Sequence, residues 1–425
     1  MPGGFRRKRA REQWRVRVDV NGLMRGVVGD AGLADEDLAA FAPRFDAMPI
    51  GLERRVGFPV VPGKTDLKRT AQLADDTRGR FDDLVVLANR ELARGIRALV
   101  DAVPVGAADP DRPALRIHLI DGIDPDRLAM LLGRLDLRRT LFDVVSAAGD
   151  ALDTMSQFLI VRDRLLQELG AVEYKQHVVI TTAVAAGALR QIVNDEGFRD
   201  LAFPPDVDDR CAVLTPAALF PAACAGADLG ALAAGAADMA ARCDTSDVAA
   251  NPARLLAIAL ARAQGACSVV SPLRFRALAA WIEHGGGGPH AVPLVLFLTV
   301  AERADDDEEL PKTYQDLDSI GHLGGQRLAT LGELEREGCE LALWSVGRPT
   351  VTVVAPQVDE YAVGQIVWLV HTAAALARAL AEPAADVAAP LAERFAWGLA
   401  GRPGYESERA EAQRLAGRKE TRYVV

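Results

Sequence analysis

The stretch VVITTAVAAGALRQIVNDE, residues 178–196, sets the fold class, because a strand pattern passes into a helix pattern within it. Val178 to Thr182 is a short run rich in β-branched residues, which is typical of a strand buried on both faces of a sheet. Ala185 to Glu196 then carries apolar residues three or four positions apart, which is typical of a helix with one buried face. A strand followed directly by a helix is half of a βαβ unit, so this stretch predicts a parallel sheet covered by helices.

The same rhythm extends toward the N-terminus as far as Asp82. Three more apolar runs predict strands, at Leu84 to Leu87, Leu115 to Ile120 and Phe142 to Ser146. Segments with helical spacing lie between and after them, at Arg90 to Val103, Pro125 to Leu135 and Asp153 to Gly170. Strands that alternate with helices predict an α/β unit with a mainly parallel sheet.

A second unit of the same class follows an interruption at Pro204, Pro205 and the acidic residues from Asp206 to Asp209. Its predicted helices are Leu219 to Ala241, one that opens at Asn251-Pro252, Leu273 to Ile282, Gly324 to Glu337 and Tyr361 to Leu380. Its predicted strands are Cys267 to Val270, Val292 to Val300 and the region Leu341 to Ala355, with a solvated acidic loop at Glu302 to Glu309. We therefore expect an N-terminal arm with helices at residues 1–56, a first domain at 57–205 and a second domain with C-terminal helices at 206–425.

The composition is that of a globular protein and disfavours several classes of partner. Of 425 residues, 50% are hydrophobic and 25% are charged, a balance from which a large core can form. The net charge of -10 argues against nucleic acid as a partner, because duplex binding depends on Lys and Arg side chains that neutralise phosphates. No signal-peptide pattern or apolar run of transmembrane length is evident, so we expect no membrane partner and a cytoplasmic location.

Two smaller features bear on partners and metals. The basic arm between Arg6 and Arg17 is either a solvated tail or a contact for an acidic partner. The five cysteines are widely spaced and form no CxxC pair, so we interpret them as reduced core thiols and expect no metal site.

Sequence blocks in both units resemble the glucose-6-phosphate isomerase family, in particular its compact bacterial form. The strongest are Val178 to Thr182 with Gly187 to Arg190, and Arg210 with Val213-Leu214-Thr215-Pro216, where the family has GGR-x-S-VLTP. Weaker blocks follow in family order at Ala225 to Asp228, Asn251-Pro252, Leu317-Asp318 with Leu323 and Gly325, Asp359 to Tyr361, and Gly401 to Glu406. The resemblance spans nearly the whole chain and implies two stacked αβα sugar-isomerase domains, usually in a homodimer.

The resemblance also implies a reaction, the interconversion of glucose 6-phosphate and fructose 6-phosphate without a cofactor. Moving a proton between two carbons needs a positioned carboxylate base. The family adds a histidine for ring opening, an arginine that stabilises the oxyanion, a lysine near the sugar and a Ser/Thr-rich loop that binds the phosphate. A sugar phosphate is therefore the implied ligand of this chain.

The phosphate loop of the family reads approximately SKSGTTTE, and the matching segment here is Ser146 to Asp153. Ser146 and Gly149 are retained and are the candidate substrate-binding residues. The other hydroxyl positions hold alanine, aspartate and leucine, and Asp150 puts a negative charge where a phosphate dianion would bind. The loop is therefore predicted to bind phosphate poorly.

Arg210 matches the family arginine and is the candidate catalytic residue, although Asp208 and Asp209 replace the two glycines before it. Two interpretations stay open: Arg210 stabilises an oxyanion, or it forms an Asp–Arg ion pair that closes a loop. The family's glycine turn GIGGS is replaced by Leu87 to Glu91, whose side chains would fill the space that glycine leaves for a ligand. Arg90 in this turn either meets a phosphate or is a solvated surface residue.

The remaining catalytic positions of the family have no counterpart in this chain. The glutamate position falls in the glycine run Gly285 to Gly288, with Glu283 as the nearest carboxylate. The histidine segment is shortened, and His284 and His290 beside the glycine run are either substitutes or ordinary loop residues. The lysine position is occupied by Glu393.

Two functions of different classes therefore stay open. In the first, the chain is a catalytically degenerate relative kept for binding or assembly, as a homodimer or paired with a related subunit. In the second, it is an active sugar-phosphate isomerase that uses substituted residues. Several site positions have changed together while the strand and helix blocks persist, which favours the first.

Overall fold

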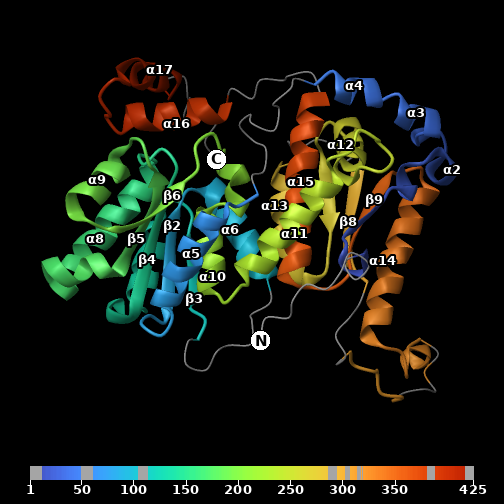
Figure 1. The fold of residues 1–425 in the computed structure, drawn as a ribbon, viewed down its shortest axis with the longest axis horizontal. Coiled ribbons are helices and arrows are strands. Elements are labelled where there is room, and N and C mark those ends of the chain that lie inside the picture. The colour runs from blue at the N-terminus through green and yellow to red at the C-terminus, as the bar shows by residue number, and fades with distance from the viewer. Residues whose placement is uncertain are drawn as a thin grey trace, which may run out of the picture.

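The computed structural model describes residues 12–48, 61–103, 113–285, 294–301, 307–313, 317, 319–380 and 388–416. Within these residues, two sheets form two lobes that lie side by side (Figure 1). The described part of the first sheet has strand order β3-β2-β4-β5-β6, and all neighbours are parallel. The bounds are β2 Asp83–Ala88, β3 Arg116–Ile120, β4 Thr140–Ser146, β5 Val178–Ala183 and β6 Arg199–Phe203.

Strands β2, β4 and β5 of the first sheet are buried on both faces, as the apolar runs predict, whereas β3 at one edge is partly exposed, contrary to the prediction, and so is β6 at the other. Leu84 and Val86 of β2 belong to the main hydrophobic core, whereas Val85 and Leu87 belong to a second apolar cluster. Alternate side chains of a strand point to opposite faces, so each face has its own apolar layer. Helices α5 Lys64–Thr77, α6 Arg90–Ala102 and α10 Pro216–Cys224 contribute to the main core, and α7 Pro125–Leu132, α8 Leu152–Glu173 and α9 Ala188–Glu196 to the second cluster.

The order of strands in the first sheet contains a topological switch point. β2 lies between β3 and β4, and the chain adds β3 on one side of β2 and the later strands on the other. Turns that leave neighbouring strands toward opposite faces open a crevice beyond the carboxyl ends of those strands, where ligands of such sheets bind. Ala88 and Ser146 mark this end of β2 and β4.

The described part of the second sheet has the order β1-β9-β8-β7. β7 Cys267–Val270, β8 Leu294–Val300 and β9 Thr350–Ala355 are parallel, whereas β1 Arg17–Asp19 is antiparallel to β9. The sequence pattern missed β1 because three residues are too few to show a period of two. It also missed β6, where Arg199 and Asp200 interrupt the apolar run. The N-terminal segment thus supplies an edge strand to the second sheet, and the domain boundaries at 56/57 and 205/206 stay a prediction.

Two predicted elements of the second unit need correction. The helix predicted at residues 219–241 is two helices, because the chain turns at Gly226 (φ +98°) and the side chain of Asp228 caps the second one. The strand region predicted at 341–355 begins only at Thr350, since the preceding helix continues to Ser345. The helices of this lobe are α2 Arg25–Val28, α3 Asp35–Ala39, α4 Ala42–Asp46, α11 Leu229–Arg242, α12 Pro252–Arg262, α13 Arg276–Gly285, α14 Leu328–Ser345 and α15 Glu360–Leu380.

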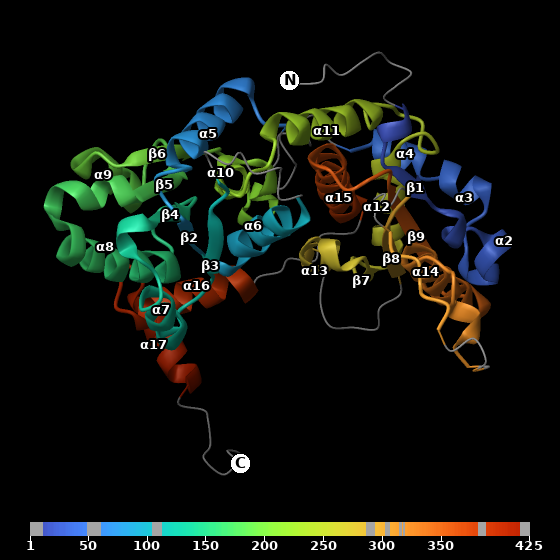
Figure 2. The same cartoon turned by 90° about the horizontal axis from the view of Figure 1, so that it is seen from below.

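α15 is the central helix of the second lobe. It is long and apolar enough to span a membrane by length and composition, which corrects the expectation that no such stretch exists, but 72% of its apolar window is buried. A Cβ added to Gly235 of α11 would collide with the Tyr361 carbonyl, and one added to Gly364 with the Leu232 carbonyl. Figure 2 shows α11 and α12 beside α15. Its burial among these neighbours is that of the core helix of a globular lobe.

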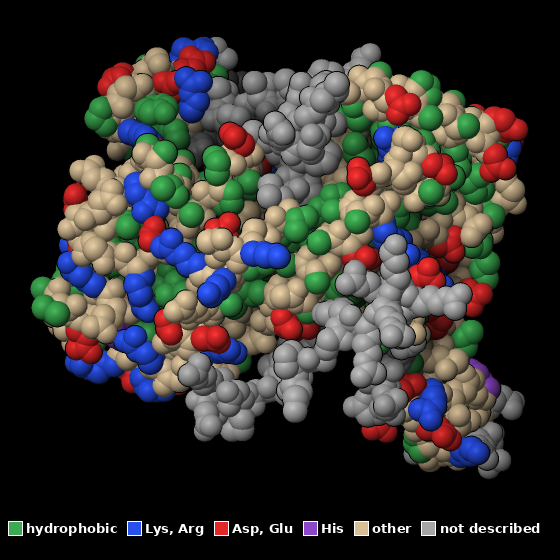
Figure 3. All heavy atoms as spheres, viewed as in Figure 1, with side chains coloured by type: hydrophobic (Ala, Val, Ile, Leu, Met, Phe, Trp, Pro, Cys, Tyr) green, Lys and Arg blue, Asp and Glu red, His purple; other side chains and the backbone are tan. Residues whose placement is uncertain are grey.

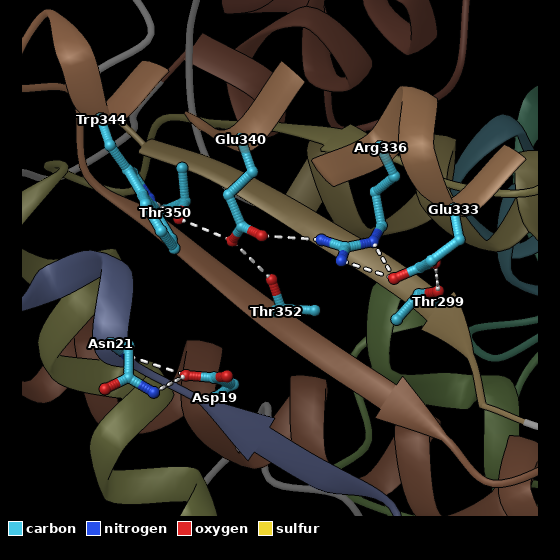
Figure 4. A network of polar contacts seen from close by, with 9 residues as sticks. All are labelled: Asp19, Asn21, Thr299, Glu333, Arg336, Glu340, Trp344, Thr350 and Thr352. Atoms are coloured by element: carbon cyan, nitrogen blue, oxygen red, sulfur yellow. Dashed lines mark hydrogen bonds and ion pairs between the residues drawn. The ribbon is translucent and has the colours of Figure 1, made fainter. Parts of the chain in front are cut away.

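A polar network joins α14 to the second sheet (Figure 4). The buried carboxylate of Glu340 accepts hydrogen bonds from the hydroxyls of Thr350 (3.0 Å) and Thr352 (2.9 Å) on β9. Its other oxygen lies 2.7 Å from the guanidinium of Arg336, which also pairs with Glu333 at 2.5 Å. The face of α14 that meets the sheet is therefore charged.

Two leucines of α14 lie on its outer side. Leu334 is 52% exposed and Leu341 is 50% exposed. These two leucines are seven positions apart and share one face of the helix, while Arg336 and Glu340 point to the opposite face. A helix with its charged face inward and its apolar face outward leaves apolar surface without a partner in the described chain.

The C-terminal helices lie beside the lobe of the first sheet (Figures 1 and 2). They are α16 Ala388–Leu399 and α17 Glu406–Ala416. The loop between them carries Arg402, which forms an ion pair with Asp150 of the first lobe. The C-terminal end of the predicted second domain therefore contacts the first sheet's lobe.

Candidate functional site

A cleft of about 920 Å³ lies beyond the carboxyl ends of β2, β3 and β4, at the switch point of the first sheet. The turns that follow these strands form its walls, together with Asp208 to Arg210 and Trp397. The predicted site residues Ser146 and Arg210 both line this cleft, and Gly149 belongs to the same turn as Ser146. The fold thus brings together the residues that the sequence singled out.

The turn after β4 is stabilised by its own residues. The buried hydroxyl oxygen of Ser146 accepts a hydrogen bond from the Gly149 N–H at 3.1 Å. Gly149 has a φ of +74°, a left-handed conformation that glycine adopts without strain. Gly187 approaches so closely that a Cβ there would lie 2.6 Å from the Ala148 carbonyl oxygen. Ser146 and Gly149 therefore maintain the shape of the turn in this structure.

Asp150 has an ion-pair partner that the sequence analysis missed. The guanidinium of Arg402 lies 2.7 Å from its carboxylate. The same guanidinium lies 4.2 Å from the ring centre of Trp397 and 5.3 Å from that of Tyr405. Because 252 residues separate Asp150 from Arg402, no local pattern could have linked them. The pair partly neutralises the negative charge of Asp150. It also occupies the positive charge of Arg402.

The ion-pair partner of Arg210 is Glu91, whose Oε2 lies 3.3 Å from Nε of Arg210. The interpretation that Arg210 pairs with an aspartate was therefore wrong, because its partner is a glutamate. The Asp208 carboxylate accepts a hydrogen bond from the Arg210 backbone N–H at 2.9 Å, because Asp208 caps the short helix Asp209–Leu214. Asp209 instead accepts a hydrogen bond from the Asn89 amide at 2.6 Å.

The turn after β2 is filled by side chains, as the loss of the glycine turn predicts. Asn89 caps α6 by accepting a hydrogen bond from the Leu92 N–H at 3.0 Å. Arg90 and Glu91 in the first turn of the helix line the cleft beside it. This part of the cleft therefore presents an amide and two charged groups in place of exposed backbone N–H groups.

Acidic side chains outnumber basic ones around the cleft. Burial raises the pKa of Asp209, while the hydrogen bond from Asn89 opposes that effect. The excess of acidic side chains around the cleft is not general: on the face of the molecule in Figure 3, acidic and basic side chains are interspersed. Among the described residues that line the cleft, the acidic ones are Glu91, Asp121, Asp150, Asp153, Asp208 and Asp209, and the basic ones are Arg90 and Arg210.

Glu283, the carboxylate closest in sequence to the family's base position, does not line this cleft. It is exposed, and its Oε1 accepts a hydrogen bond from the Val269 N–H of β7 at 2.6 Å. Gly286 to Gly288 and His290 lie outside the described residues, and so do the side chains of His284 and Glu393. The structure therefore leaves the predictions for these positions untested.

The cysteines are distributed differently from the prediction. Burial raises the pKa of Cys211 to about 11 and that of Cys224 to about 12, as expected for core thiols. Cys339 on α14 is exposed, so its assignment to the core was wrong. Within the described residues, no group of three or more His, Cys, Asp and Glu side chains is arranged to hold a metal ion.

The fold and the cleft define a class of protein: two α/β lobes with mainly parallel sheets and a candidate ligand site at a switch point. The structure is similar to a glucose-6-phosphate isomerase from Chlamydia trachomatis, with a TM-score of 0.68 and 17% identity over 83% of this chain and 76% of that chain. This similarity confirms the predicted fold of two αβα sugar-isomerase domains. No family model matches the sequence.

Curated relatives narrow the class to one family. A glucose-6-phosphate isomerase from Carboxydothermus hydrogenoformans is 26% identical over 96% of this chain and 99% of its own length. A probable glucose-6-phosphate isomerase from Halobacterium salinarum is 30% identical over 67% of this chain and 71% of its own length. The chain belongs to the glucose-6-phosphate isomerase family, as the resemblance of its sequence blocks implied.

Proposed function

We propose that this chain is a catalytically degenerate member of its family, kept for binding or assembly. The observation that carries this proposal is the charge of the cleft, where acidic side chains outnumber basic ones and Arg210 is already paired with Glu91. A sugar phosphate brings about two negative charges, and each like charge at contact range opposes binding by about 1 kcal/mol or more. A cleft of this composition disfavours the substrate that the family name specifies.

The phosphate turn supports the same proposal. A phosphate is usually held by several hydroxyl and backbone N–H donors at a helix N-terminus. Here Ala147, Ala148 and Ala151 offer no hydroxyl, and the Gly149 N–H is engaged by Ser146. Asp150 adds a carboxylate at the same place. Few hydrogen-bond donors are therefore available to compensate for the hydration that a phosphate loses on binding.

An active isomerase with substituted residues is the second candidate, and one observation favours it. Glu91 and Arg210 stand side by side at the cleft, 3.3 Å apart. A carboxylate that moves a proton and a guanidinium that stabilises an oxyanion are the two groups that enediol chemistry requires. In this reading, Glu91 replaces the missing base.

A coupled assay of the purified protein with fructose 6-phosphate tests the two candidates. We expect turnover well below about 1 s⁻¹ for the wild-type chain, since typical enzymes exceed that value. Turnover near that value that is lost in Glu91→Gln and in Arg210→Gln would establish the second candidate. A turnover unchanged in both variants points to a contaminating isomerase. The activity of a separately prepared double variant, Glu91→Gln with Arg210→Gln, then gives the background rate to subtract.

Binding is measured separately from turnover. A thermal shift with glucose 6-phosphate or fructose 6-phosphate reports any ligand that binds the folded state, whether or not it reacts. A shift without turnover supports retention for binding. Absence of both leaves assembly as the retained role.

We propose further that the assembly is a homodimer or a pair with a related subunit. The outward leucines of α14 support this, because an exposed apolar helix face is typical of a surface that meets another chain.

A further inference from the structure

A second, apolar pocket of about 140 Å³ lies beside the cleft, on the far side of Arg210. Its walls come from α12, α13, α15 and the start of the helix Asp209–Leu214. The apolar lining consists mainly of Leu260, Ile282, Val370, Ala374 and the ring of Trp281. Glu91 and Arg210 line both this pocket and the cleft, so the two spaces share a wall.

His371 of α15 also lines this pocket and is only 6% exposed. Its Nε2 lies 3.2 Å from the Arg210 carbonyl oxygen, and a carbonyl can only accept, so Nε2 carries the proton. The other nitrogen, Nδ1, then holds a lone pair, and no hydrogen-bond donor reaches it among the described residues. Burial lowers the pKa of His371 to about 4, which keeps the ring neutral near pH 7.

Trp281 and His371 together hold the backbone of Arg210. Their rings meet edge to face with centres 4.6 Å apart. The Trp281 indole N–H donates to the same Arg210 carbonyl at 3.4 Å. The ring of His371 is thus fixed from two sides, and its unpaired acceptor has a defined position.

We propose that this pocket is a binding site for a small neutral molecule with a ring-sized apolar body and one hydroxyl or N–H donor, which pairs with Nδ1 of His371. The volume matches such a body, because an apolar cavity of about 150 Å³ accommodates benzene. The donor is required because a buried acceptor without a partner costs free energy that a donor on the ligand would recover. Most of the wall is apolar, and its charged residues are Arg378 and the paired Glu91 and Arg210, so this molecule differs in class from a sugar phosphate.

This inference is independent of the proposed loss of isomerase activity, since none of its ligand contacts uses the phosphate turn. The inference does connect the apolar pocket with the cleft, because a ligand in the pocket would contact Trp281 and His371, which hold the backbone of Arg210.

The test uses the full chain and two fluorinated probes, 4-fluorophenol and fluorobenzene, with binding followed by ¹⁹F NMR. We expect 4-fluorophenol to bind about 3- to 10-fold more tightly than fluorobenzene, the effect of one net hydrogen bond. His371→Leu removes both ring nitrogens, and with them the Nδ1 acceptor, while it keeps an apolar side chain at this position. In this variant we expect the two probes to bind within about twofold of each other.

A second variant tests the location. Ala374→Trp fills the pocket and should abolish binding of both probes, with circular dichroism as the check on folding. If that variant does not fold, Ala377→Leu, at another position of the lining, replaces it. Failure of both probes to bind wild type at millimolar concentration overturns the proposal. Equal binding of the two probes to wild type, or binding that survives the filled pocket, overturns it as well.

Discussion

Asp143 is a carboxylic acid in the interior of β4, with no exposed surface. Its Oδ1 accepts a hydrogen bond from the Thr181 hydroxyl at 3.1 Å, and Oδ2 has no partner among the described residues. Burial raises the pKa of Asp143 to about 8, with the Thr181 hydrogen bond acting in the opposite direction. The folded chain therefore holds a proton that the unfolded chain releases above about pH 4. The free energy of unfolding should fall as the pH rises from about 4 to about 8.

Asp143→Asn should remove this dependence, because the amide has no charged form to desolvate. We expect the variant to be more stable than wild type by about 2–4 kcal/mol at pH 8 and by only about 1 kcal/mol at pH 5. Urea unfolding at the two pH values measures the difference. An equal gain at both values would contradict the assigned cause.

Asp82 provides the matched control for Asp143. Its hydrogen bond to Arg139 lowers the pKa of this exposed carboxyl, so its charged form is the one favoured by folding. Asp82→Asn should therefore give no gain at pH 8. A gain like that of Asp143→Asn would show that any lost carboxylate stabilises this acidic chain.

Asp150→Asn tests the charge of the phosphate turn. The substitution removes a negative charge and frees the guanidinium of Arg402. We expect the affinity for inorganic phosphate to rise roughly tenfold, the effect of about 1.4 kcal/mol. Isothermal titration calorimetry at low salt measures the change, because salt screens such interactions.

The control for Asp150 is Asp206→Asn, which changes the net charge equally outside the lining of the cleft. Asp206 has a φ of +61°, a conformation that asparagine also tolerates. Phosphate affinity should stay within about twofold of wild type in this variant. The same rise in both variants would assign the effect to net charge and remove the role given to Asp150.

Among the elements, α11 and α15 form a close contact that depends on glycine. The Cβ of an alanine at position 364 would overlap the Leu232 carbonyl, and backbone cannot move aside as a flexible side chain can. We expect Gly364→Ala to reduce the free energy of unfolding by about 3 kcal/mol. Chemical denaturation measures the loss.

Gly338 of α14 is the matched helical control, since a Cβ there meets nothing within 4 Å. Gly338→Ala should raise the free energy of unfolding by about 0.5–1 kcal/mol, the difference in helix propensity. A loss at Gly338 similar to that at Gly364 would show that close packing of α11 against α15 is not the cause.

The sequence predicted a helix or strand well where the pattern of apolar residues stayed the same from one end of the element to the other. β2, β3, β4 and β5 of the first sheet were predicted to within two residues because apolar residues dominate them, whereas β6 was missed. The helix at 219–241 was misread because alanine and glycine on both sides of Gly226 share the same helical spacing, and only the turn there separates them. α14 was misread at its end because Leu341 to Leu343 look like the start of a strand.

At the scale of the whole molecule, the outward leucines of α14 make a prediction about assembly. Leu334→Glu with Leu341→Glu should convert a dimer to a monomer, because charged groups at an apolar interface lose their hydration without a partner. Sedimentation velocity measures the mass. The control is Leu159→Glu with Val172→Glu on α8, which are 58% and 82% exposed and belong to the other lobe. A monomeric wild type, or a dimer that survives the α14 changes, would contradict the proposed surface.

The sequence by itself determined the α/β class, the two units and the family, because these depend on residue periodicity and on motifs within short segments. Only the tertiary structure decided which charges meet. Asp150 and Arg402 are 252 residues apart, and His371 and the Arg210 carbonyl are 161 apart, so no local pattern encodes either contact. The physical reason is that side-chain electrostatics depend on distances through space, and the packing of two lobes and the C-terminal helices sets those distances.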